Sequence, residues 1–227
     1  MASEIEEFHH DLFQDVLQKA DGEGKLLQES FFEIYTQEMI EAGDITEAQY
    51  SHYERRGIRV DGYGGDPAQL RDSTLSVLVN DFDQSPDKVN TLTRSELGTS
   101  FKRLSQFVTR SLDPDFRNGL EETDPAFGLT DLIATRWNSI SKVRMFILTN
   151  RVLSSRVDRI DAGQIDTVPV VYSVWDLSRM HRNRTAGEVR EEMNIDLENE
   201  FGGAISALPA HLKHDQYESY IAVMPGE

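Results

Sequence analysis

Two aspartates on consecutive predicted strands are the acids best placed to do chemistry. Asp61 lies in a short segment that alternates polar and apolar residues and runs into glycines, and Asp81 ends a second, more apolar segment. A hairpin of these two strands can bring both carboxylates together, and paired carboxylates bind Mg²⁺ for phosphodiester hydrolysis. Glu33 or Glu38, on a helix that precedes the strands, could add a third oxygen ligand.

The same two aspartates also have a structural interpretation. Asp61 is followed by Gly62, and Asp-Gly is a common turn dipeptide, while Asp81 could cap the end of its strand. Metal-dependent nucleases of this architecture usually need an acid and a lysine two positions apart on the second strand, where both face one side. Those positions hold Val79 and Asp81, and no lysine is within reach on that strand. This weakens the catalytic interpretation and leaves nuclease activity open.

A second group of residues combines an aromatic ring with cations. Trp175 is followed closely by Arg179 and Arg182, a mixture that can hold a nucleotide or single-stranded nucleic acid. The alternative is an arginine-rich helix end whose charges are satisfied by acidic neighbours, for example Asp176 and Glu188. Both interpretations remain open from the sequence.

Other kinds of site find no support. The chain has no cysteine, which excludes zinc–cysteine sites, iron–sulfur clusters, thiol nucleophiles and disulfides. No glycine segment matches the phosphate-loop or dinucleotide-binding pattern, and no Gly-x-Ser-x-Gly motif occurs.

One further basic cluster consists of Arg55, Arg56 and Arg59.

Helical and extended segments follow one another in a mixed order. Apolar residues at helical spacing predict two N-terminal helices, a helix that begins with the capping box of Thr93 and Glu96, and another around residues 129–140. The predicted strands cover residues 57–63, 74–82, 143–148, 167–175, 194–197 and 217–224. A second capping-box spacing, Thr185 with Glu188, predicts a short helix near the C-terminal end.

This order predicts a mixed α/β fold with a central mixed sheet flanked by helices. We expect an acidic helical arm packed on the core at residues 1–50, an α/β core at residues 51–175 and a mixed α/β extension at residues 176–227. The chain stops directly after an apolar strand. We therefore expect the protein to continue into a further C-terminal region.

The charge of the chain restricts its partners. With 40 acidic and 23 basic residues the formal net charge is -17, and such a field repels phosphate backbones except at a local basic patch. The first twenty residues carry acids where a secretory signal needs positive charge. The apolar stretches fall far short of the ~20 residues of a membrane helix. The sequence therefore predicts a soluble, cytoplasmic protein without a membrane partner.

Several segments resemble a known protein family. Residues 174–180 (VWDLSRM) resemble a segment of the bacterial AIPR proteins, the abortive infection phage resistance family. Further similar segments are 58–63 (IRVDGY), 146–150 (FILTN), 194–196 (NID), 207–209 (ALP) and 217–226 (YESYIAVMPG). The resemblance covers most of the chain, and its Trp-Asp and Tyr…Pro-Gly segments are the more specific ones.

The resemblance implies a cytoplasmic bacterial protein of phage defence, of which this chain is the N-terminal region. Some relatives contain a PD-(D/E)XK nuclease-like core, and Asp61 matches the first acid of that core. Because Val79 and Asp81 stand where active members carry an acid–lysine pair, Mg²⁺-dependent cleavage of phage or plasmid DNA is in doubt and the centre is expected to be degenerate. The alternative is a non-enzymatic module that senses a phage component or self-associates, while a C-terminal region carries the effector chemistry.

Overall fold

The computed structural model describes residues 4–64, 73–154, 163–188, 207–209 and 220–222. The chain divides into two compact units, residues 1–186 and 187–227. In the second unit β9 (Ala207–Pro209) pairs antiparallel with β10 (Tyr220–Ala222), which confirms the described part of the strand predicted at 217–224. The strand predicted at 194–197 lies outside the described residues.

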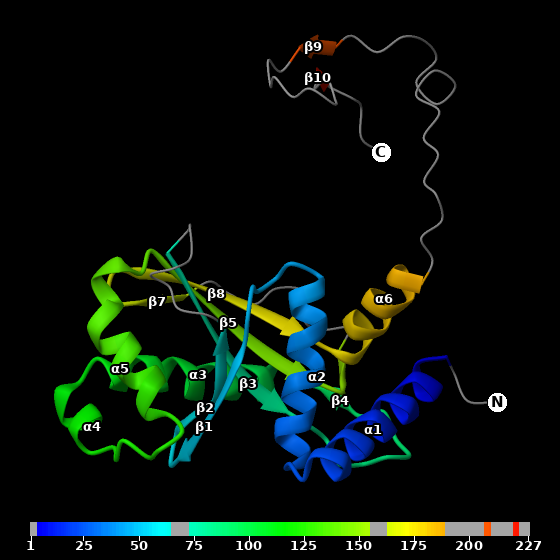
Figure 1. Cartoon of the computed structure of the whole chain (residues 1–227), viewed down its shortest axis with the longest axis horizontal. Helices are drawn as coiled ribbons and strands as arrows, with labels where there is room; N and C mark the ends of the chain where they lie inside the picture. The colour runs from blue at the N-terminus through cyan, green and yellow to red at the C-terminus, as the bar shows by residue number, and fades with distance from the viewer. Residues whose placement is uncertain (1–3, 65–72, 155–162, 189–206, 210–219, 223–227) are drawn as a thin grey trace. The chain divides into compact units, whose positions relative to one another are not determined.

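A six-stranded mixed sheet forms the centre of the first unit (Figure 1). Its strands, in spatial order, are β1 (Gln49–Arg55), β2 (Ile58–Gly64), β3 (Thr74–Asp81), β5 (Lys142–Thr149), β8 (Val168–Trp175) and β7 (Gly163–Ile165). The central strands β3, β5 and β8 are parallel, whereas β1–β2, β2–β3 and β7–β8 are antiparallel pairs. The predicted mixed sheet is therefore confirmed.

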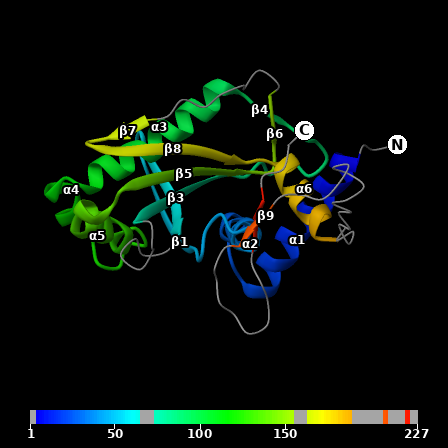
Figure 2. The ribbon, with the colours of Figure 1, turned by 90° about the horizontal axis from the view of Figure 1, so that it is seen from above.

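Helices cover this sheet in two groups. The helices are α1 (Glu4–Glu23), α2 (Leu27–Glu41), α3 (Arg94–Ser111), α4 (Pro114–Asn118), α5 (Phe127–Arg136) and α6 (Leu177–Glu188). Figures 1 and 2 show α1, α2 and α6 grouped together, apart from α4 and α5. A two-stranded parallel pair, β4 (Thr91–Leu92) with β6 (Val152–Leu153), lies outside the main sheet. No helix in the described ranges combines the length and apolar character needed to cross a bilayer.

Each face of the central strands belongs to a separate hydrophobic core. Leu78 and Phe146 are fully buried in the core that contains α1, α2 and α6, while Val79 and Ile147 are buried in the core of α3 and α5. Successive side chains of a strand point to opposite faces, so a strand covered on both sides must be apolar almost throughout. This requirement explains why the sequence predicts β3, β5 and β8 so clearly.

The sequence analysis missed β1 and the start of α6. The buried residues of β1 are Ser51 and Tyr53, while Glu54 and Arg55 at its end are exposed, so this edge strand lacks the apolar pattern that marks the central strands. The second predicted capping box is wrong, because Thr185 lies inside α6. The capping box of Thr93 and Glu96 is confirmed at the start of α3.

A glycine next to Asp61 allows β1, β2 and α2 to approach closely. A Cβ atom at Gly62 would lie 2.3 Å from the Cζ atom of Phe32 on α2 and 2.6 Å from the backbone oxygen of Gln49 on β1. The backbone oxygen cannot move away without distorting the sheet. The position therefore requires glycine for its small size.

We expect Gly62→Ala to destabilise the protein by about 1–3 kcal/mol, because the added methyl group overpacks the contact between the sheet and α2. Gly98→Ala is the matched control, since Gly98 lies exposed in α3 and a Cβ atom added there would meet nothing within 4 Å. That change should stabilise the helix by about 0.5–1 kcal/mol. Urea unfolding of both variants measures the difference, and equal midpoints would contradict the packing argument.

Candidate functional site

Asp61 is a buried carboxylate held by three donors. Its side chain has no exposed surface. One oxygen, Oδ1, lies 2.6 Å from Nδ1 of His52, while Oδ2 accepts hydrogen bonds from Nε of Arg59 at 3.0 Å and from the backbone amide of Asn80 at 2.8 Å. Residues from β1, β2 and β3 therefore meet at this single carboxylate.

Local irregularity of the sheet creates this arrangement. The β2–β3 ladder runs from Gly64 to Gly62, and immediately beyond it the side chain of Asp61 accepts the Asn80 amide. The β1–β2 register also shifts between Tyr50 and Tyr53, as in a β-bulge. Such bulges redirect side chains. Here the bulged segment contains His52, whose ring contacts the buried acid.

The buried acid is the main cause of the pKa shift of His52 and contributes to that of Tyr50. The hydrogen bond to Asp61 raises the pKa of His52 above its ordinary value of 6.5, with nearby Glu54 acting in the same direction and burial and Arg59 opposing it. Burial, assisted by the charges of Asp61 and Glu29, raises the pKa of Tyr50 to about 12. The ring of Tyr50 lies parallel to that of His52, with 6.3 Å between the centroids. Protonation of His52 is therefore favoured in the folded protein.

Asp81 has a different set of partners. Its Oδ2 accepts a hydrogen bond from the hydroxyl of Thr149 at 3.0 Å and pairs with Arg151 at 3.2 Å. Arg151 also donates to Glu96 at 2.8 Å, and hydrogen bonds from Thr93 and Arg151 lower the pKa of Glu96 to about 2. Asp81 thus connects the ends of β3 and β5 to the start of α3, and it shares none of the three donors that hold Asp61.

The acids predicted to complete a metal site form ion pairs elsewhere. Glu33 pairs with Lys19 at 3.1 Å and with Lys25 at 2.6 Å. Glu38 pairs with Arg184 at 2.8 Å and accepts a hydrogen bond from Asn183. Within the described ranges, no three histidine or acidic side chains come together as a set of metal ligands. Glu33, Asp61 and Asp81 therefore do not gather into one set of ligands.

Trp175 lies in the core rather than at a surface. The residue is 1% exposed, and its indole nitrogen donates to Oδ2 of Asp44 at 2.7 Å. Arg179 donates to the same oxygen at 2.5 Å and lies over the indole, 4.5 Å from the ring centroid. The Trp175 ring and Arg179 therefore contact each other, and both donate to Asp44. Arg182 is exposed on α6.

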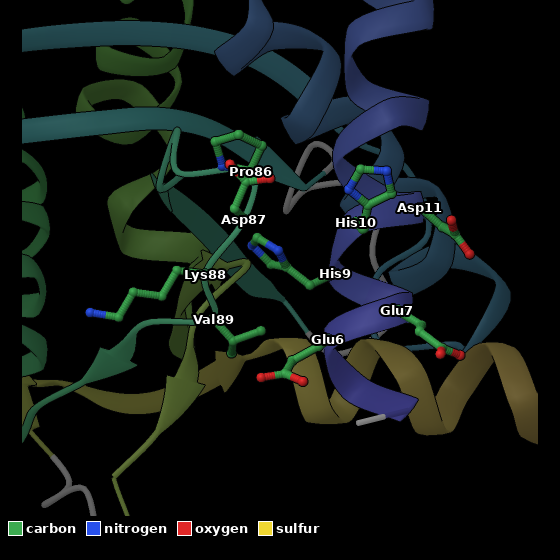
Figure 3. Close-up of a pocket in the computed structure, with 9 residues that line it drawn as sticks. All are labelled: Glu6, Glu7, His9, His10, Asp11, Pro86, Asp87, Lys88 and Val89. Carbon is green, nitrogen blue, oxygen red and sulfur yellow. The ribbon is translucent and has the colours of Figure 1, made fainter. Parts of the chain in front are cut away.

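The described surface also contains a pocket of about 660 Å³ between α1 and the segment that follows β3 (Figure 3). Figure 3 shows His9 and Glu6 projecting from α1 toward Lys88 and Val89. Burial lowers the pKa of His9, and its Nε2 lies 3.4 Å from the amide nitrogen of Asn150. His9 is therefore a buried ring that contacts Asn150, the residue that follows β5.

Sequence reasoning missed His52, the residue that contacts Asp61 from the edge strand. The sequence around it, Tyr50 to Tyr53, mixes aromatic and polar residues, which is a weak strand signal. Recognising that signal would have placed a third strand beside Asp61. The contact itself depends on the bulge, for which the sequence offers no marker.

The ion pair between His52 and Asp61 makes stability depend on pH. Because folding raises the pKa of His52, its contribution is fully present below the unfolded value of about 6.5 and is lost as the pH rises through the folded value. The difference in unfolding free energy between the wild type and His52→Gln should therefore be largest below pH 6.5 and shrink above it. Urea titrations across this range, with His10→Gln on exposed α1 surface as control, measure the trend, and a constant difference would contradict it.

Comparison with known proteins identifies the family of this sheet and its surrounding helices. The family model for the abortive infection phage resistance protein N-terminal domain matches residues 31–182, which is more than half of the chain and extends from α2 into α6. No curated protein and no solved structure matches the chain. The matched range includes Asp61 and all three of its donors. The chain belongs to the family of abortive infection phage resistance protein N-terminal domains.

Proposed function

We propose that this domain acts in phage defence in the bacterial cytoplasm as a nuclease-like module whose metal-dependent centre is degenerate. Its family supports the role in abortive infection. The order of α2, β1, β2, β3, α3 and β5, with β4, α4 and α5 between them, supports a nuclease-like core, because such cores follow the order helix, strand, strand, helix and strand. The observation that carries the proposal is the neutralisation of Asp61 by Arg59 and His52.

The charge balance at Asp61 disfavours a divalent cation. Mg²⁺ takes oxygen ligands in a nearly octahedral shell, so it needs carboxylate lone pairs that point to an accessible space. Both oxygens of Asp61 already accept from nitrogen donors, and two of those donors are side chains that are or can be cationic. A metal ion would have to displace Arg59 and deprotonate or expel His52.

The second strand supports the same interpretation. Val79 has an aliphatic side chain, which offers no metal ligand, and it is buried in the core of α3 and α5, while Asp81 pairs with Arg151. No lysine follows on β3. Two acids that each have an arginine partner are suited to holding strands together. They are not suited to polarising a phosphodiester, which needs an open cation site.

We expect the purified chain to show no DNA cleavage above background with Mg²⁺ or Mn²⁺, and Asp61→Asn to leave that rate unchanged. Asp61→Asn should instead lower stability by about 1.5–3 kcal/mol, because it weakens charged hydrogen bonds at a buried site. Asp87→Asn is the matched control, since Asp87 is exposed. Metal-dependent cleavage that disappears in folded Asp61→Asn protein, but not in Asp87→Asn, would overturn the degenerate centre and establish Asp61 as a metal ligand.

The non-enzymatic alternative is a module that senses a phage component or self-associates. The ion-paired state of both aspartates favours it as much as it favours a degenerate nuclease. Light scattering of the purified chain over a wide concentration range tests self-association. A plating assay with a phage-sensitive host that expresses the protein tests defence: protection that survives Asp81→Asn in a stably folded protein would support sensing over cleavage.

A further inference from the structure

The β1–β2 hairpin concentrates positive charge on a strongly acidic protein. Four arginines belong to it or contact it, and His52 adds a fifth basic group. These arginines are Arg55, Arg56, Arg59 and Arg103. Two acidic residues partly offset this positive charge: Glu54, which pairs with Arg103 at 2.5 Å, and the buried Asp61. The hairpin is therefore locally positive, although the chain carries a net charge of -17.

Two of these basic side chains are held in place but retain free donors. Arg59 contacts Asp61 and Glu54 through Nε, and neither terminal amino group has a hydrogen-bond partner in the described part of the chain. His52 contacts Asp61 through Nδ1, which leaves Nε2 available. The side chains of His52 and Arg59 are 37% and 19% exposed. The buried carboxylate therefore orients two basic side chains whose other donors are unused.

The exposed end of the hairpin extends this basic surface. Arg56 and Gly57 form the two-residue turn, where Gly57 has a φ of 79° that suits glycine. Arg55 and Arg56 are exposed, and the guanidinium of Arg55 lies 5.5 Å from the centroid of the Tyr53 ring. The positions of the basic residues thus extend along the strand from His52 to the turn, a distance of roughly 13 Å at the rise of a β-strand. Arg55 lies on the face of Tyr53, which packs in the core of α3 and α5.

The position of this surface in the sheet also suits a ligand. β2 runs antiparallel to β3, so the hairpin turn lies at the end of the sheet where the parallel strands β3, β5 and β8 finish. In open α/β sheets, ligands bind outside the carboxyl ends of the strands. Asn80, near the end of β3, connects this edge directly to Asp61.

We propose that His52, Arg59 and the hairpin arginines form a binding site for the phosphate groups of a nucleic-acid backbone, with Asp61 as the residue that positions the two inner donors. Phosphate oxygens accept readily from guanidinium and imidazolium groups, and Arg matches them through paired donors. A row of cations over several residues fits a polymer better than a single phosphate. The proposal does not depend on whether the domain cleaves DNA.

The net charge of the protein sets the expected strength of this interaction. Long-range repulsion from the other acidic surfaces opposes the approach of a polyanion, so we expect weak binding that falls steeply with salt. For single strands, the slope of log K against log salt is about -0.7 for each phosphate neutralised. Two or three phosphates on this hairpin therefore predict a slope of roughly -1.4 to -2.1.

Fluorescence anisotropy with a labelled single-stranded DNA oligomer, with the full chain at low salt, tests the site. Arg56→Gln and Arg59→Gln should each weaken binding by about three- to tenfold and reduce the salt slope by roughly one phosphate. Arg56 has no contact with the rest of the described structure that folding requires, so it remains informative if Arg59→Gln unfolds. Arg136→Gln is the matched control, because Arg136 is exposed at the end of α5, which precedes the start of β5 and so lies away from the hairpin turn.

Each result either supports or overturns the proposal. Loss of affinity in both hairpin variants but not in Arg136→Gln supports it. Competition by millimolar inorganic phosphate at constant ionic strength, accompanied by a shift of the His52 ring signals in NMR, would overturn the assignment to a nucleic-acid backbone and assign the site to a small phosphate ester. Absence of binding by the wild type, or equal affinity of Arg56→Gln, Arg136→Gln and the wild type, would overturn it, whatever the outcome of the cleavage assay.

Discussion

A carboxylate that is completely buried loses its hydration water, so nearby groups must supply the hydrogen bonds that this water made. At Asp61 those groups come from three strands: His52 from β1, Arg59 from β2 and the Asn80 amide from β3. Satisfying the acid therefore fixes how the edge of the sheet is built. The bulge in β1 and the close approach of Phe32 to Gly62 lie directly beside this carboxylate.

A comparable group of ion pairs lies at the carboxyl ends of the central strands β3 and β5. Arg151 follows β5 and joins Asp81 of β3 to Glu96 at the start of α3, and its backbone oxygen accepts from the amide of Leu177 at the start of α6. The carboxyl ends of the parallel strands are thus linked to the two helices that begin beside them. In both places an aspartate of a predicted strand is paired with an arginine, which stabilises strand order and removes a free carboxylate.

The sequence predicts the parts of this fold that depend on local patterns. β3, β5 and β8 are continuous apolar runs because two cores cover them, and the capping box of Thr93 and Glu96 lies within one helical turn. Contacts between residues far apart in the sequence cannot be predicted from such local patterns. Trp175 is buried in the core that contains α1, α2 and α6, and its indole donates to Asp44, 131 residues earlier; no spacing rule connects the two. The partner of Asp61 on β1 was missed for a different reason, because an edge strand with few apolar residues gives little signal.

The neutralised acid and the positive hairpin are two consequences of one electrostatic arrangement. A carboxylate that binds a metal ion presents negative charge to a cation, and the surrounding protein must leave it room. At Asp61, His52 and Arg59 occupy the positions that a metal ion would need, and their remaining nitrogen donors are not used by Asp61. A ligand therefore meets positive rather than negative charge. Under the function and the binding site proposed above, fixed cations at Asp61 bind phosphate, while neither oxygen of this carboxylate is left free to hold a metal ion for cleavage. The two proposals are therefore compatible: the same ion pairs that disfavour a metal ion at Asp61 orient the donors proposed to bind phosphate.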